Sequence, residues 1–133
     1  MSQLLKSQVG SRQLLMGNEA IVRGALEAGI SVAAGYPGTP SSEIIEKLAE
    51  LATDKENNLY AEWSTNEKVA LEVAAAASFA GLRSMAAMKQ PGLSVAADFL
   101  LHLSASGTRG GMVLVSSDDP GAISSTNEGE SRP

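Results

Sequence analysis

Short strand-like runs alternate with longer helical runs along most of this chain. The strand-like runs cover residues 30–36, 59–64, 83–89 and 110–117. The helical runs cover residues 18–28, 41–52, 66–80 and 93–104. Strands that alternate with helices of about ten to fifteen residues form βαβ units, in which the strands run parallel and the crossovers are right-handed. The pattern therefore predicts an α/β fold, an open and mostly parallel sheet with helices on both faces.

The length of 133 residues suits a single domain. We expect a short N-terminal segment over residues 1–12 and one domain over residues 13–133. The last strand-like run is followed by residues 118–133, which contain no clear covering helix. The expected sheet is therefore incomplete at its C-terminal end, and we expect the chain to be a fragment or a truncated subunit.

The composition argues against several classes of protein. A net charge of −5 is unfavourable for nucleic-acid binding, which normally uses a basic patch. The chain has no cysteine and a single histidine, His102, which excludes disulfides, thiolate-bound zinc or iron–sulfur clusters and a histidine-rich metal site within it. No run approaches the roughly 18 apolar residues of a membrane span, and the N-terminus lacks the apolar stretch of a signal peptide. A cytoplasmic protein is the expectation.

Open parallel sheets bind ligands outside the carboxyl ends of their strands. In the expected sheet those ends carry GYPGTPSS (35–42), EWSTNE (62–67), KQPG (89–92) and SSDDPGAISS (116–125). These segments combine Gly–Pro turns with hydroxyl and carboxyl groups, whereas the opposite strand ends are short or plainly solvating. Any chemistry is therefore expected at this one edge.

Glu67 is the main candidate, because it stands at the start of an alanine-rich helix. Its face of that helix carries Ala70 and Leu71, so the carboxyl group is expected to be desolvated and able to share a proton with a ligand nitrogen. A purely structural interpretation competes with this one. Ser64-x-x-Glu67 is the pattern of a helix capping box, in which both side chains only satisfy backbone groups.

The helix behind Glu67 is small and apolar on every side over residues 74–77. Such a helix is normally buried all round, so we expect one side to meet a second subunit or domain. Lys68 and Glu72 are spaced as an i,i+4 ion pair on a solvated face. Three aromatic residues are expected in the core rather than in a site: Tyr36, Tyr60 and Trp63. His102 is expected in the core or in an interface.

The other three strand ends offer weaker candidates. Thr39, Ser41 and Ser42 stand at a helix N-terminus, which favours an anion, although a simple turn with a cap explains them as well. Residues 89–92 read as a loop that offers a lysine and an amide. Residues 118–121 read as an Asp–Pro–Gly turn, with weak support for Mg²⁺ or Ca²⁺ binding. The chain has neither a P-loop nor a G-x-G-x-x-G motif.

Three of these segments carry a resemblance to a known family. They are GYPGTPSSEI, AEWSTNEKVALEVAAAASFAGLRSMAAMKQPGLSVAAD and VLVSSDDPGAISSTNEGESR. Together they resemble the N-terminal pyrimidine-binding domain of the 2-oxoacid:ferredoxin oxidoreductases, above all the alpha subunit of the indolepyruvate type. The resemblance runs from about residue 12 to the end. It implies a thiamine diphosphate-dependent enzyme that oxidatively decarboxylates aryl pyruvates to acyl-CoA, with pyruvate or other 2-oxoacids as alternatives.

The resemblance also implies roles for single residues. Glu67 matches the glutamate that hydrogen-bonds N1′ of the thiamine aminopyrimidine, where the shared proton favours the imino tautomer that activates the cofactor. Thr39 and Pro40 match a turn near the cofactor ring and the substrate. Gln90 and Gly92 match a loop that borders the cofactor. The resemblance assigns no metal ligand here and no role to the two carboxylates of residues 118 and 119.

Some parts of the family's site are missing from this sequence. The family binds the diphosphate and Mg²⁺ through a separate domain with a Gly-Asp-Gly motif, and it binds iron–sulfur clusters through cysteines; the chain has neither. The resemblance thus implies half a site, completed by a diphosphate-binding domain of the same subunit or of a second copy, with a beta subunit and ferredoxin as partners. A non-catalytic assembly subunit of the same fold and a generic flavodoxin-like domain remain alternatives.

Overall fold

The computed structural model describes residues 9–121 and 129–132. Its elements, in chain order, are α1 (Gly17–Glu27), β1 (Val32–Gly35), α2 (Ser42–Ala52), a single 3₁₀ turn η2 (Lys55–Asn57), β2 (Tyr60–Trp63), α3 (Glu67–Phe79), β3 (Ser84–Lys89), α4 (Gln90–Ser106) and β4 (Met112–Ser117). The alternation of strands and helices is confirmed, and most element bounds lie within a few residues of those expected.

The four strands form one sheet in the order β2-β1-β3-β4, and each pair of neighbours is parallel. Gly35 of β1 lies level with Trp63 of β2 and Ala87 of β3. Lys89, the last residue of β3, lies level with Ser117, the last residue of β4. The open parallel sheet is therefore confirmed, and all four carboxyl ends meet along one edge.

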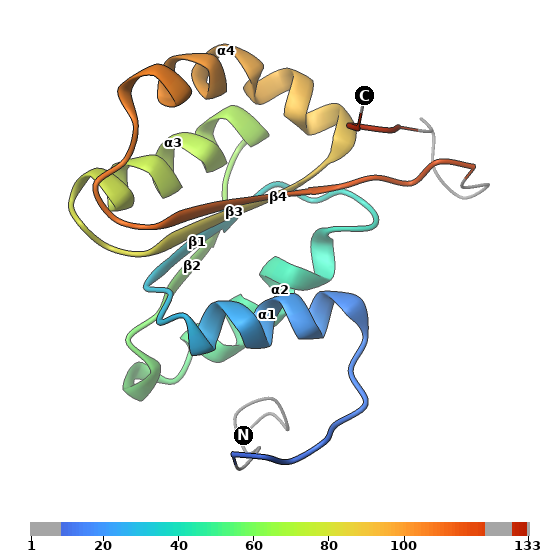
Figure 1. The fold of residues 1–133 in the computed structure, drawn as a ribbon, viewed down its shortest axis with the longest axis vertical. Helices are drawn as coiled ribbons and strands as arrows, with labels where there is room; N and C mark the ends of the chain where they lie inside the picture. The colour runs from blue at the N-terminus through green and yellow to red at the C-terminus, as the bar shows by residue number, and fades with distance from the viewer. Residues whose placement is uncertain (1–8, 122–128, 133) are drawn as a thin grey trace.

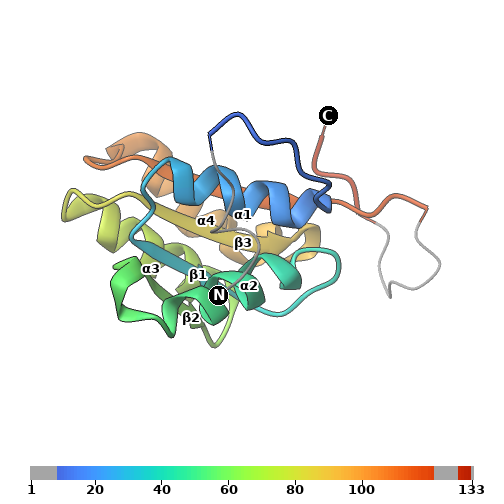
Figure 2. The ribbon, with the colours of Figure 1, turned by 90° about the horizontal axis from the view of Figure 1, so that it is seen from below.

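The sheet is the middle layer of three (Figure 1, Figure 2). Helices α1 and α2 cover one face, and α3 and α4 cover the other. Strand β3 contributes side chains to the core on both faces of the sheet. Met85 and Ala87 belong to the core beneath α1 and α2, and Ala86 and Met88 belong to the core beneath α3 and α4. A central strand buried on both faces explains why its sequence is continuously apolar.

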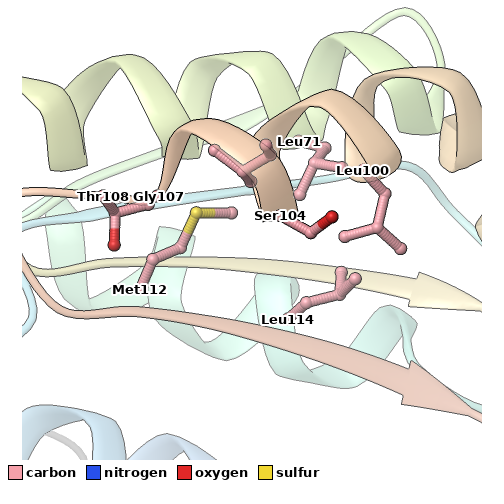
Figure 3. Close-up of a pocket in the computed structure, with 8 residues that line it drawn as sticks. Leu71, Leu100, Ser104, Gly107, Thr108, Met112 and Leu114 are labelled. Carbon is pink, nitrogen blue, oxygen red and sulfur yellow. The ribbon is translucent and has the colours of Figure 1, made fainter.

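The last strand, β4, is covered unequally on its two faces. Met112 and Leu114 pack toward α3 and α4, where a hollow of about 280 Å³ remains between these helices and the strand (Figure 3). On the other face, Val113 is 53% exposed and borders a second hollow of about 260 Å³ near the end of α1. Val115, on the same face, packs partly against the core beneath α1 and α2. Residues 122–128, which follow β4, lie outside the described residues, so the expected lack of a covering helix there stays a prediction.

Within the described part of the chain, no helix is long and apolar enough to cross a membrane.

Candidate functional site

The carboxyl edge of the sheet brings together the segments after the four strands. These segments are 36–41 after β1, 64–66 after β2, the junction of β3 with α4, and 118–121 after β4. The parallel arrangement places them side by side although up to about 80 residues separate them in the chain. All the candidate residues predicted from the sequence, Thr39, Pro40, Glu67, Gln90 and Gly92, lie in or directly after these segments.

The junction of β3 with α4 differs from its prediction. Residues 89–92 are expected as a loop, but β3 ends at Lys89 and α4 begins at Gln90 without any loop between them. Pro91 fits the first helical turn, since the N–H group it lacks would have no helical partner there. Gln90 and Gly92 therefore belong to a helix N-terminus, whose free N–H groups give the edge a positive partial charge.

The start of α3 also differs from its prediction. The amide oxygen of Asn66 accepts a hydrogen bond from the backbone N–H of Val69 at 3.0 Å, so Asn66 is the N-cap. The hydroxyl of Ser64 donates instead to Glu62 at 2.9 Å. The capping box of Ser64 with Glu67 is therefore wrong, because Asn66 is extended at the residue just before the helix and its short side chain reaches the first turn. Glu67 begins α3 and has no part in the cap.

Gly92 makes room for the side chain of Glu67. A Cβ atom on Gly92 would lie 2.6 Å from Oε1 and 2.7 Å from Cδ of Glu67, well inside contact distance. Glu67 is partly buried, and it forms no hydrogen bond or ion pair within residues 9–121 and 129–132. Its carboxylate thus lies between the N-termini of α3 and α4, whose dipoles favour a negative charge, and both oxygens are available to a ligand.

In the loop after β1, the serine hydroxyls form hydrogen bonds within the turn itself. Ser41 donates to the carbonyl of Gly38 at 2.9 Å, and Ser42 accepts from the N–H of Gly38 at 2.8 Å. The side chain of Asn18, in α1, holds the loop by donating a hydrogen bond to the carbonyl of Pro40 at 2.9 Å. Thr39 is exposed, so its hydroxyl remains open to a ligand, as does that of the exposed Tyr36 at the start of the loop.

The loop after β4 is held by two contacts that the sequence pattern does not reveal. Lys89 Nζ lies 3.4 Å from Asp119 Oδ2, in an ion pair that is largely buried. Asp118 Oδ2 accepts hydrogen bonds from the N–H and the hydroxyl of Ser131, both at 2.8 Å. These two bonds, the backbone one foremost, hold the pKa of Asp118 below its ordinary value. The described residues contain no acidic or histidine cluster that could hold a metal ion.

The segment 129–132 folds back over this edge. The N–H of Asp119 donates to the carbonyl of Gly129 at 3.1 Å. A Cβ atom on Gly129 would lie 2.8 Å from Cδ of Gln90, so the Gln90 side chain packs on this glycine. Figure 1 shows the C-terminal segment beside the first turn of α4. Residues 122–125 of the predicted strand-end segment lie outside the described residues.

Several expectations for individual side chains are wrong. Tyr36, Tyr60 and Trp63 are 40%, 55% and 40% exposed and not in the core, because β2 forms an edge of the sheet and Tyr36 lies beyond the end of β1. The side chain of His102 is 77% exposed, so it is not a core residue, and its expected place in an interface stays a prediction.

Helix α3 itself is less enclosed than expected. Ala74 and Ala75 are buried against the sheet and α4, whereas Ala76 is exposed. Lys68 does not pair with its helical neighbour Glu72 but reaches Asp98 of α4 at 3.0 Å. The tight packing of α3 on α4 brings Asp98 within reach. The partner expected against α3 stays a prediction.

The fold and the site define a class of protein. The chain is an open parallel α/β domain with an available carboxylate at the ligand-binding edge of its sheet. Residues 23–124 match the family described as pyruvate flavodoxin/ferredoxin oxidoreductase, thiamine diphosphate-binding. The chain belongs to this family, which confirms the resemblance found in its motifs.

Individual relatives agree with this family. The chain is 54% identical over 129 residues to the indolepyruvate oxidoreductase subunit IorA of Pyrococcus abyssi, a match that covers 97% of this chain and 20% of that protein. It is 42% identical over 83 residues to the 2-oxoglutarate synthase subunit KorA of Archaeoglobus fulgidus, which covers 62% of this chain and 23% of that one. The chain spans about a fifth of the length of the curated relatives it matches.

A solved structure has the same fold. The 2-oxoglutarate:ferredoxin oxidoreductase from Magnetococcus marinus, with 2-oxoglutarate, coenzyme A and succinyl-CoA bound, superposes with a TM-score of 0.69 at 26% sequence identity. The superposition covers 80% of this chain and 18% of that chain.

Proposed function

We propose that this chain forms the pyrimidine-binding part of a thiamine diphosphate-dependent 2-oxoacid:ferredoxin oxidoreductase of the indolepyruvate type. The proposal rests on one observation, that the carboxylate of Glu67 is available to a ligand. Asn66 caps α3 in its place, and Gly92 leaves space for its side chain, so a carboxylate is kept available at the ligand-binding edge. Membership of the family and the names of the relatives support the same conclusion.

In this proposal the residues of the chain hold one half of the cofactor. Thiamine diphosphate, when bound, supplies the nucleophilic carbon that adds to the keto group of a 2-oxoacid and takes up the electrons released with CO₂. Glu67 would hold a proton between its carboxylate and the ring nitrogen N1′ of the bound cofactor, and the dipoles of α3 and α4 would stabilise the negative charge of Glu67. Thr39 and Pro40 would border the cofactor ring from the loop after β1, and Gln90 and Gly92 would border it from the first turn of α4.

The remaining parts of the enzyme are proposed to lie outside these 133 residues. The diphosphate and its Mg²⁺ would be held by a diphosphate-binding domain, on the same subunit or on a second copy, and iron–sulfur clusters would carry electrons to ferredoxin. A beta subunit would complete the assembly. The 133 residues alone are then inactive, which fits the fact that they span about a fifth of the relatives' length.

The test is Glu67→Gln in the full-length protein that contains this chain, with its partner subunits present. Losing the shared proton should lower thiamine-dependent oxidation of indolepyruvate by roughly 10²- to 10⁴-fold and leave the melting temperature nearly unchanged. Glu72→Gln, on the same helix, is the matched control and should retain activity. Full activity of Glu67→Gln would overturn the proposal.

Assays with pyruvate and 2-oxoglutarate beside indolepyruvate decide the substrate class within the same experiment. A wild-type complex that oxidises none of these 2-oxoacids, and does not bind thiamine diphosphate in calorimetry, would instead identify a non-catalytic assembly subunit.

A further inference from the structure

We infer that Lys89 and Asp119 form a positioning pair, which holds the first turn of α4 so that Gly92 orients the carboxylate of Glu67. The inference rests on the proposed function, because it gives Glu67 the role described above. Lys89 Nζ lies 3.4 Å from Asp119 Oδ2, and the two side chains are only 15% and 8% exposed. The pair joins the carboxyl ends of two neighbouring strands, β3 and β4.

The burial of this pair distinguishes it from the other lysine ion pairs described. Lys47–Glu50 and Lys68–Asp98 have side chains that are between 33% and 68% exposed. Removing two charges from water costs free energy that their attraction rarely recovers, so a buried pair is poorly explained by stability alone. A geometric role, fixing which strand end meets which loop, explains it better.

Lys89 lies where three of the four strand-end segments meet. A Cβ atom on Gly38 would lie 2.9 Å from Cβ and 3.7 Å from Cδ of Lys89, so the loop after β1 rests on the aliphatic part of the lysine. The ammonium group reaches Asp119 in the loop after β4. Displacing Lys89 would therefore disturb the loop that carries Thr39 as well as the end of β4.

A displacement of Lys89 would also reach Glu67 directly. Helix α4 begins at Gln90 with no loop to absorb movement, and Gly92 follows in the same helical turn. The side chain of Glu67 packs against Gly92 so closely that even one carbon atom more would collide with it. The ion pair, the first turn of α4 and Glu67 thus form one continuous chain of contacts.

The main variant of the experiment removes both charges of the pair together, so that neither is left buried without the other. Lys89→Met with Asp119→Leu exchanges both side chains for apolar ones of similar size, a change that folded proteins often tolerate. Asp119→Asn is a second, nearly isosteric variant that removes only the carboxylate of the pair. Two variants serve as controls: Lys89→Arg keeps the pair, and Lys47→Met removes an exposed ion pair elsewhere. Two measurements are made: the NMR signals of the Glu67 amide and carboxyl group in the 133-residue chain without cofactor, and kcat and KM in the full-length enzyme.

The double variant and Asp119→Asn should move the Glu67 signals and lower kcat by roughly 10- to 100-fold, with little change in KM. Lys89→Arg should retain most of kcat, and Lys47→Met should match the wild type. The inference is overturned if either disrupting variant folds with the Glu67 signals at their wild-type positions, even when its melting temperature falls. If Glu67→Gln alone proves inactive while the double variant keeps wild-type kcat, the proposed function stands and the positioning pair fails.

Discussion

The side chain of Glu67 occupies the space in which any residue other than glycine at position 92 would place its Cβ atom. The two residues are on different helices, and the carboxyl carbon of Glu67 would lie 2.7 Å from that added atom. This contact links the candidate catalytic carboxylate to the first turn of α4. It makes Gly92 part of the site through the absence of a side chain rather than through any group it offers.

Gly92→Ala should therefore force Glu67 into another rotamer and destabilise the chain by about 1–3 kcal/mol, as expected for overpacking. Glu67→Ala should relieve the collision, so the double variant should be more stable than the sum of the single changes predicts. Urea unfolding of the four proteins measures this coupling. Gly24→Ala, in α1 with no atom within 4 Å of the new Cβ, is the control and should stabilise by about 0.5–1 kcal/mol. Additive effects of Gly92→Ala and Glu67→Ala would contradict the described contact.

The N-cap of α3 can be assigned by exchange of the Val69 amide proton with solvent. Asn66→Ala removes the acceptor of this N–H group and should cost about 1 kcal/mol at the helix start, so the amide should exchange faster. Asn66→Asp keeps an acceptor oxygen and should leave the Val69 amide protected from exchange with solvent. Ser64→Ala loses only the hydrogen bond to Glu62 and should leave the Val69 amide unchanged. Faster exchange in Ser64→Ala than in Asn66→Ala would restore the capping-box interpretation.

At the opposite edge of the sheet, Gly110 and Ser78 exchange two hydrogen bonds. The N–H of Gly110 donates to the carbonyl of Ser78 at 2.8 Å, and the Ser78 hydroxyl donates to the carbonyl of Gly110 at 2.6 Å. A Cβ atom on Gly110 would overlap the carbonyl group of Leu82, lying 2.8 Å from its carbon atom.

Gly110→Ala should therefore lower the free energy of unfolding by about 3 kcal/mol or more, because the backbone carbonyl of Leu82 cannot rotate away as a side chain can. Gly111→Ala is the matched control, since its new Cβ would lie 3.8 Å from the nearest atom, in Arg83, and its effect should stay within about 0.5 kcal/mol. Thermal unfolding compares the two variants. Equal stability of both would show that the end of α3 is not held as described.

The pKa of Asp118 should lie below its ordinary value of 3.8, because two hydrogen bonds from Ser131 stabilise the Asp118 anion. The bond from the backbone N–H contributes most, and the bond from the hydroxyl is the next largest cause. A carboxyl group with a lowered pKa in the folded state stabilises the fold above pH 3.8, and this contribution is lost as the pH falls through the folded pKa. Carboxyl-carbon NMR measures the titration directly. Ser131→Ala should move the pKa of Asp118 part of the way back and leave Asp98, whose pKa is lowered by Lys68, unchanged. An unmoved Asp118 titration would exclude the hydroxyl as a cause.

Much of the fold could be predicted because its signals are local. The alternation of strand-like and helical runs, and the fully apolar run of β3, depend on residues that are neighbours in the chain. The edge that carries the candidate residues also follows from the pattern, since parallel strands must all end on the same side. The position of Glu67 at the start of a helix needed no tertiary information.

The misjudged features depend on contacts between distant segments. Asn66 and Ser64 offer rival capping patterns two residues apart, and the backbone conformation at residue 66 decides between them. Pro91 and Gly92 look like a turn, yet they continue directly from β3 into a helix that packs on α3. The exposure of Trp63 follows from the place of β2 at the edge of the sheet, which its own residues do not reveal.

Patterns along the chain are enough to predict the class of fold, the order of its elements and the edge at which a ligand can bind. The contacts between the residues of that edge emerge only in the folded domain: Glu67 with Gly92, Lys89 with Asp119, and Asp118 with Ser131. The two kinds of feature differ because the interactions behind them act over different ranges. Periodicity and turn chemistry act within a few residues, whereas steric fit and buried ion pairs join residues that only the completed sheet brings into contact.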